Sequence, residues 1–212
     1  MIRAVANPSG VELVARLPAG AVAYLDADWL APEAPGSPPS LVVVDGRLRF
    51  EDGPARELGA DADPDLAAAR VLLAVADGAA AAVRAGPAEV LGRGLVAERV
   101  RSLLGARGVA LADGVERPTA IVDGTGDPAS LGRATERLAD LGMLVLAGEP
   151  AGRRVPLNVY TDVHRRGLRV FGVAPPAADC GAEAAAAPAV DPPVHVQSGE
   201  TLPPALWYRV SC

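Results

Sequence analysis

A strand-to-helix junction with the spacing Gly92-x-Gly94-x-x-Ala97 is the clearest candidate for chemistry in this sequence. The first glycine allows a tight turn, the second lets a phosphate approach the backbone, and alanine permits close packing of helix and strand. The amide N–H groups that open the following helix carry partial positive charge, which favours a bound anion. The sequence therefore predicts a site for dinucleotide phosphates, formed by Gly92, Arg93, Gly94, Leu95 and Val96.

Other polar loops extend the predicted cofactor site. Asp113 lies about twenty positions after Gly92, where a carboxylate accepts hydrogen bonds from the adenosine ribose hydroxyls and favours NAD over NADP. A second glycine loop closes the strand that follows, and another glycine ends the strand after it; these residues are Gly124, Thr125, Gly126 and Gly148. The alternative is a sheet whose glycines serve packing alone, with Asp113 solvated in a turn.

Acid–base side chains near this predicted cleft are the candidates for catalysis. Asp123 and Thr125 stand at the carboxyl end of a strand, where open α/β sheets bind their ligands, although lining the cleft and capping the next helix also explain them. Tyr160 and His164 precede the last predicted strand, and a surface or helix-end position is the simpler interpretation of His164. We find no Ser–His–Asp or Cys–His arrangement in a recognisable context.

Alternating strand and helix patterns must position these residues. We expect strands at 88–91, 109–112, 119–122, 143–147 and 168–172, and helices at 66–85, 97–105 and after Asp127-Pro128. This alternation predicts an α/β fold, a Rossmann-like, mostly parallel sheet with flanking helices. Earlier short strands, including a hairpin at Asp45-Gly46, predict a small N-terminal β appendage.

These patterns divide the chain into three predicted parts. Residues 1–60 form the β-rich appendage, a remnant of a substrate domain, and residues 61–174 form a truncated Rossmann-like cofactor domain. Residues 175–212 form a Pro/Ala-rich tail whose final segment, with Trp207 and Tyr208, packs back onto the core. The cofactor domain is short because a parallel crossover needs a dozen or more residues, and the link from Asp113 to Ala120 is about half that. The strand ending at Asp113 is therefore short, displaced or antiparallel.

Composition excludes several classes of function. The net charge is −6, and no cluster of Arg is dense enough to predict nucleic-acid binding. Arg70 and Asp77 interrupt the longest apolar stretch, which argues against a membrane span, and the N-terminus lacks a signal-peptide pattern. Cys180 and Cys212 form neither a disulfide framework nor a metal cage. We expect a cytoplasmic protein without a metal site.

The motifs resemble those of the medium-chain, alcohol/threonine dehydrogenase-like dehydrogenases over roughly residues 63–174. Residues 122–128 (VDGTGDP) are similar to that family's IDATG-x-P loop, and residues 141–150 are similar to its GG-x-V-V-L-V-G strand. Residues 162–168 resemble the segment before its last strand. The resemblance implies a nicotinamide cofactor, NAD or NADP, and a small-molecule substrate. It also implies a homodimer through the last strand, residues 168–173, whose apolar edge needs covering.

The sequence departs from this family in its catalytic part. The zinc-binding Cys-Gly-x-Asp and Gly-His-Glu motifs and the four-cysteine lobe are absent. The first hypothesis is therefore a zinc-free NAD(P)-dependent oxidoreductase acting on a small metabolite, in a specialised biosynthetic pathway. The second is a descendant that uses the inherited cleft, without the cofactor, for a cyclisation or isomerisation. The third is a non-catalytic binding or partner protein.

Overall fold

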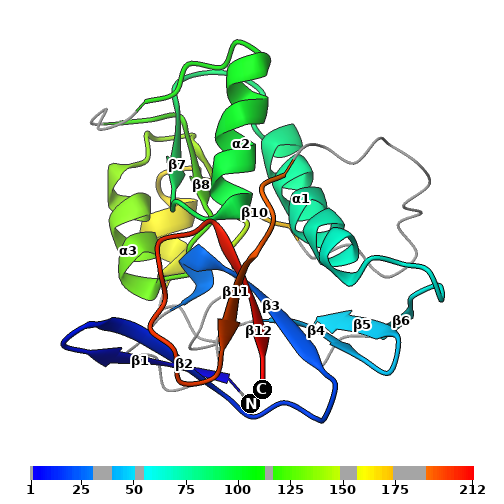
Figure 1. Cartoon of the computed structure of the whole chain (residues 1–212). Coiled ribbons are helices and arrows are strands. Elements are labelled where there is room, and N and C mark those ends of the chain that lie inside the picture. Colours follow the sequence, from blue (N-terminus) through cyan, green and yellow to red (C-terminus); the bar gives the residue numbers. More distant parts are fainter. Residues whose placement is uncertain (1, 31–39, 51–54, 113–116, 149–156, 174–189) are drawn as a thin grey trace.

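The chain folds into a parallel sheet with flanking helices that rests on a second, mostly antiparallel sheet (Figure 1). The computed structural model describes residues 2–30, 40–50, 55–112, 117–148, 157–173 and 190–212. The helices and the parallel sheet occupy the upper part of Figure 1 and the antiparallel strands the lower part. This arrangement is the α/β, Rossmann-like class that the strand and helix pattern predicts.

The parallel sheet contains four strands in the order β10-β9-β8-β7. They are β7 (Ala88–Leu91), β8 (Ala120–Asp123), β9 (Met143–Leu146) and β10 (Arg169–Gly172), and every neighbouring pair is parallel. The strand expected at 109–112 is reduced to a single parallel bridge between Leu111 and Ala88, on the free side of β7. It does not extend into a full strand because the short link to β8 leaves no room for the usual crossover helix and its following strand.

Three helices cover the two faces of this sheet. Helix α1 (Pro64–Ala82) is continuous through Gly78, and its N-cap is Asp63, whose carboxylate accepts from the N–H groups of Asp65 and Leu66. Helix α1 and helix α2 (Leu95–Ala106) share one apolar cluster with Val90, Val122 and Val145. Helix α3 (Pro128–Arg137) covers the opposite face, where alternate strand residues join a separate cluster made of Ile121, Leu131, Ala134, Leu138, Leu144 and Leu168.

The second sheet contains six strands in the order β11-β12-β3-β4-β5-β6. The strands are β3 (Val22–Asp26), β4 (Leu41–Val44), β5 (Arg47–Phe50), β6 (Arg56–Glu57), β11 (Val194–Gln197) and β12 (Trp207–Ser211). The predicted Asp45-Gly46 hairpin joins β4 to β5, and both turn residues have positive φ. Strand β12 pairs with β3, so both ends of the chain contribute to this sheet. Trp207 and Tyr208 are buried within it.

A hairpin of β1 (Ile2–Asn7) and β2 (Gly10–Ala15) packs on the antiparallel sheet. The sequence did not predict β1, because its two buried side chains, Ile2 and Ala4, alternate with exposed ones in a segment too short to show a pattern. Between the two large sheets, Tyr24, Trp29, Leu41 and Leu48 join the same apolar cluster as α1. The segment that follows β3 is therefore held against the parallel sheet.

Candidate functional site

Three turns meet where strands β7, β8 and β9 end. The N–H of Gly124 donates to the carbonyl of Leu91 (3.0 Å), and the N–H of Gly148 donates to the carbonyl of Asp123 (2.8 Å). A Cβ built on Gly148 would lie 2.3 Å from the nitrogen of Gly126, so these loops touch through bare backbone. The structure thus brings together the glycines that the sequence assigns to the cofactor site. They also lie at the carboxyl edge of the sheet, where open α/β folds bind ligands.

The glycine turn, residues 92–94, connects β7 to the N-terminus of α2. Gly92 has a φ of 109°, a conformation that side-chain-bearing residues rarely adopt. Gly94 is the N-cap of α2 and supplies no side-chain acceptor, so the first N–H groups of the helix need acceptors from elsewhere. The Arg93 side chain is exposed, whereas Leu95 and Val96 are buried and face the turn with their backbone.

The carboxylate of Asp28 occupies this turn. The N–H of Arg93 lies 2.7 Å from each of its oxygens, and the N–H of Gly94 donates to Oδ2 at 2.5 Å. These short, charge-assisted contacts are the kind that a phosphate makes with a glycine-rich turn. Asp28 belongs to a single 3₁₀ turn, Ala27–Trp29, which directly follows β3. An acidic side chain of the chain itself therefore takes the position of an anionic ligand.

Two further acceptors complete the start of α2. The N–H of Val96 donates to Oδ2 of Asp26 (2.8 Å), and the N–H of Leu95 donates to the carbonyl of Leu206 (3.1 Å). Oδ1 of Asp26 in turn accepts from the N–H of Asp28 (2.9 Å). The N–H groups of residues 93–96, which the sequence assigns to phosphate binding, are thus hydrogen-bonded within the molecule.

We call the space between the turns that follow β7 and β8 the crevice, and the side chain of Trp29 closes it. Its side chain is 1% exposed, and Nε1 donates to the carbonyl of Gly124 at 3.2 Å. Phe50 meets the indole edge-on, with ring centroids 5.8 Å apart. Helices α2 and α3 follow β7 and β8 onto opposite faces of the sheet, so this is the topological switch point where ligands of such sheets bind. The donors suit the pyrophosphate of a dinucleotide, but in this conformation Asp28 and Trp29 fill the space.

Burial dominates the electrostatics of the site. It raises the pKa of Asp26 to about 7, although the hydrogen bond from Val96 opposes the shift. Burial also raises the pKa of Asp28, against the amides of Arg93 and Gly94 and the charge of Arg101. The Arg101 guanidinium donates to the carbonyls of Val90 and Gly92, beside the turn. Two carboxyl groups in one small buried space are costly to keep ionised.

The predicted catalytic residues fall into two separate places. Asp123 is buried and its Oδ1 accepts from the N–H (3.0 Å) and hydroxyl (2.7 Å) of Thr125, so this pair shapes its own loop. Burial raises the pKa of Asp123, and those hydrogen bonds oppose the shift. Tyr160 and His164 lie in a π-helical turn, Val159–His164, with their rings edge-on at 6.3 Å. That turn packs against the α3-side cluster, away from α2. Asp113 lies outside the described residues.

The residues that occupy the turn, Asp26, Asp28, Trp29 and Leu206, were not predicted from the sequence. One usable signal was present, because the Asp26-Ala27-Asp28-Trp29 stretch places two carboxyl groups and one of two tryptophans directly after an apolar run. Nothing in that stretch indicates its destination, which lies 65 positions further along the chain.

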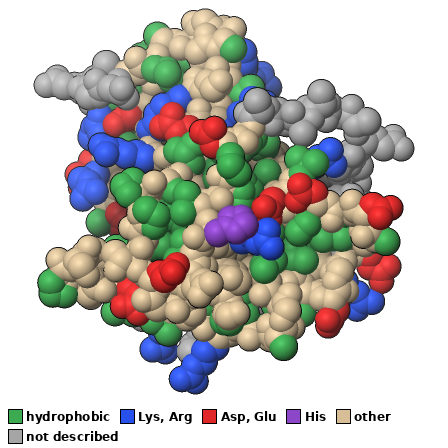
Figure 2. All heavy atoms as spheres, viewed as in Figure 1, with side chains coloured by type: hydrophobic (Ala, Val, Ile, Leu, Met, Phe, Trp, Pro, Cys, Tyr) green, Lys and Arg blue, Asp and Glu red, His purple; other side chains and the backbone are tan. Residues whose placement is uncertain are grey.

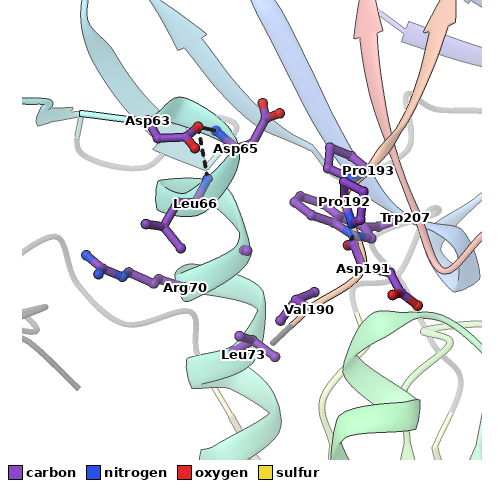
Figure 3. A pocket seen from close by; sticks show the side chains of 11 residues that line it. Asp63, Asp65, Leu66, Arg70, Leu73, Val190, Asp191, Pro192, Pro193 and Trp207 are labelled. Carbon is purple, nitrogen blue, oxygen red and sulfur yellow. Dashed lines mark hydrogen bonds between the residues drawn. The ribbon is translucent and has the colours of Figure 1, made fainter. Parts of the chain in front are cut away.

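A separate hollow of about 220 Å³ lies between the start of α1 and residues 190–193 (Figure 3). Its walls include Leu66, Leu73 and Trp207, with Asp63 and Asp65 at one end. The carboxylate of Asp65 accepts hydrogen bonds from the hydroxyl of Tyr24 (2.6 Å) and from the guanidinium of Arg209 (2.8 Å). The apolar wall is therefore the main feature that the hollow offers a ligand. On the face shown in Figure 2, acidic and basic side chains are interspersed rather than gathered into a stripe.

The described residues contain neither a group of metal ligands nor a membrane-spanning helix. No group of three or more His, Cys, Asp or Glu among them is placed to hold a metal ion. No helix in the same part of the chain is both long and apolar enough to cross a membrane.

Solved structures similar to this chain include zinc-type, medium-chain dehydrogenases, the family whose motifs the sequence resembles. L-idonate 5-dehydrogenase of Escherichia coli is 19% identical, with 54% of this chain and 43% of that chain covered and a TM-score of 0.40. A zinc-binding dehydrogenase of Sinorhizobium meliloti, bound to NADP, is 15% identical, with 63% and 49% covered and a TM-score of 0.43. TarJ of S. aureus, in complex with NADPH, is 13% identical, with 84% and 82% covered and a TM-score of 0.45.

The chain spans less than half the length of the first two of these proteins. No protein-family model and no curated protein matches the sequence. At these identities and TM-scores the likeness concerns the fold, and what the residues can bind rests on the geometry of the site.

Proposed function

We propose that this chain is a zinc-free protein of the oxidoreductase type that binds a nicotinamide dinucleotide, NAD or NADP, at the glycine turn. One observation carries the proposal: the N–H groups of Arg93, Gly94 and Val96 converge on carboxyl oxygens at the N-terminus of α2. A turn that holds carboxylate oxygens at 2.5–2.8 Å has the donors that phosphate oxygens need. The similar structures that contain NADP and NADPH are consistent with this ligand class.

The substrate of such a protein would be a small metabolite, placed near the loop of Asp123 and Thr125. Asp123 ends β8, the neighbour of β7, and the loop that follows it contacts Leu91, directly before the glycine turn, through Gly124. We assign no hydride-transfer step, because Asp28 and the dinucleotide phosphates would use the same N–H groups and cannot occupy them together.

A second candidate is a non-redox or non-catalytic protein built on the same fold. The burial of Trp29 and its hydrogen bond to Gly124 favour it, because they fill the crevice with protein side chains. In that case the carboxyl groups of Asp26 and Asp28 replace the phosphates permanently, and the turn is a structural element.

We also propose that the chain forms a homodimer through β10. All four residues of this edge strand are exposed, including Val170 (40%) and Phe171 (49%). Among the described residues no strand pairs with the outer edge of β10. An apolar edge strand is a template for pairing with another strand, and a second copy of β10 offers a matching edge.

Titration with NADH and NADPH tests the proposed cofactor, with nicotinamide fluorescence as the signal and two-dimensional amide NMR as the map. We expect saturable binding that shifts the amides of Arg93, Gly94 and Val96 and leaves Gly132, on the surface of α3, unchanged. No binding at millimolar nucleotide would overturn the proposal and favour the second candidate. Binding that shifts amides only elsewhere would place the nucleotide at another site.

A further inference from the structure

One short segment supplies the occupants of the glycine turn and of the crevice beside it. Asp26 ends β3, and Asp28 and Trp29 lie in the 3₁₀ turn that follows. We propose that the turn 27–29, through Asp28 and Trp29, is an intramolecular plug of the dinucleotide crevice, which a nucleotide must displace before its phosphates reach Arg93 and Gly94, while Asp26 keeps its place in β3. This inference rests on the proposed function, because a plug regulates binding only where a dinucleotide binds.

The first argument is that the plug and the nucleotide need the same donors. Each backbone N–H offers a single hydrogen, and those of Arg93 and Gly94 already point at the oxygens of Asp28. A phosphate oxygen at the turn would also stand beside the charge of Asp28, and two anions in one partly buried space repel strongly. Asp28 and a pyrophosphate therefore cannot occupy the glycine turn at the same time.

The second argument concerns space. A Cβ built on Gly92 would lie 2.3 Å from Oδ2 of Asp28, and one built on Gly94 would lie 1.7 Å from Oδ1 of Asp26. The room that these glycines leave, which dinucleotide-binding folds use for a pyrophosphate, is filled by the chain's own carboxyl groups. Trp29 extends the same occupation to Gly124, on the neighbouring turn.

The third argument is that the plug has features that permit its release. Asp28 is half-buried rather than fully enclosed, and a rotation of its side chain frees Arg93 and Gly94 without disturbing the pairing of β3. The 3₁₀ turn itself is closed by a long hydrogen bond, from the N–H of Leu30 to the carbonyl of Ala27 (3.4 Å). Movement of this turn would withdraw Asp28 and Trp29 together.

The test compares NADH affinity in the wild-type chain and in two variants of the plug. Asp28→Asn keeps the size of the side chain and removes its charge, and Asp28→Ser is too short to reach the turn. Asp45→Asn, in the exposed β4–β5 turn, makes the same charge change at a distance and serves as the matched control. Circular dichroism of every protein establishes that the variants are folded before titration.

We expect both Asp28 variants to bind NADH at least tenfold more tightly than the wild type, and Asp45→Asn to bind like the wild type. In a Trp207→Phe background, the emission of Trp29 should move to longer wavelength as NADH binds, because the indole leaves its buried position. Equal affinity in wild type and both Asp28 variants would overturn the plug and leave the proposed function standing. Absence of binding in every folded protein would overturn both.

Discussion

The contact between Gly94 and Asp26 makes a quantitative prediction about the folded state. In Gly94→Ala the new Cβ would begin 1.7 Å from Oδ1 of Asp26, where real Cβ atoms keep about 3 Å or more. The backbone at Gly94 has φ −74° and ψ −178°, a conformation that alanine adopts freely, so the cost comes from the contact alone. The carboxyl group of Asp26 must therefore retreat by roughly 1 Å or more.

That retreat breaks hydrogen bonds in a buried place. Asp26 is fully buried, and it accepts from the N–H groups of Val96 (2.8 Å) and Asp28 (2.9 Å). Leaving a buried N–H without an acceptor costs about 1–3 kcal/mol, and two donors are affected. We expect Gly94→Ala to lower the free energy of unfolding by about 3 kcal/mol. For a chain of this size that corresponds to a Tm lower by about 6–12 °C.

A double-mutant cycle isolates the contact. Asp26→Ala removes the carboxyl group, so in that background the Cβ of Gly94→Ala has space and its cost should fall below about 1 kcal/mol. The free energies come from urea unfolding of the four proteins, followed by circular dichroism. Gly132→Ala is the control, because a Cβ there meets nothing within 4 Å and alanine is the better helix former.

The reasoning fails if Gly94→Ala is tolerated in the wild-type chain as well as Gly132→Ala is. It also fails if the cost of Gly94→Ala is the same with and without the Asp26 carboxyl group. Either result would mean that Asp26 does not occupy the glycine turn in solution.

Three further predictions concern pH, the edge strand and a partly buried ion pair. Burial raises the pKa of Asp26 from 3.8 to about 7, so between these pH values the folded chain holds a proton that the unfolded chain releases. The free energy of unfolding should therefore fall as pH rises, by about 3 kcal/mol between pH 5 and 8. Urea unfolding at both pH values should show this loss in the wild type and not in Asp26→Asn. Val170→Lys should convert the proposed dimer to a monomer in light scattering, and a wild-type chain that is already monomeric would refute that proposal. Arg137→Met should lower the free energy of unfolding by about 2–3 kcal/mol, because the buried carboxylate of Glu89 loses the Arg137 guanidinium, which lies 2.9 Å from its Oε1. Oε2 of Glu89 has no hydrogen-bond partner that could compensate. Adding Glu89→Leu to Arg137→Met should recover most of the lost free energy.

Much of the fold could be predicted because its signals are local. The four parallel strands, the three helices and the Asp45-Gly46 hairpin follow from apolar periodicity, from capping by Asp63 and Asp127, and from residues that tolerate positive φ. The glycine turn is local in the same way, because the conformation of Gly92 and the free N–H groups at the start of α2 depend on neighbouring residues. Pairing is less local, and the strand expected at 109–112 shrank to one bridge because its crossover is short.

The sequence by itself determined that this chain would present a turn able to hold an anion, since glycine spacing and a helix N-terminus suffice for that. Tertiary structure alone decided which anion lies there. Asp28 reaches Arg93 across 65 positions, through the pairing of β3 with β12 and the packing of Trp29 against the parallel sheet. Backbone donors are set by the residues beside them, whereas their acceptors depend on which distant segment the packing of two sheets delivers to the same place.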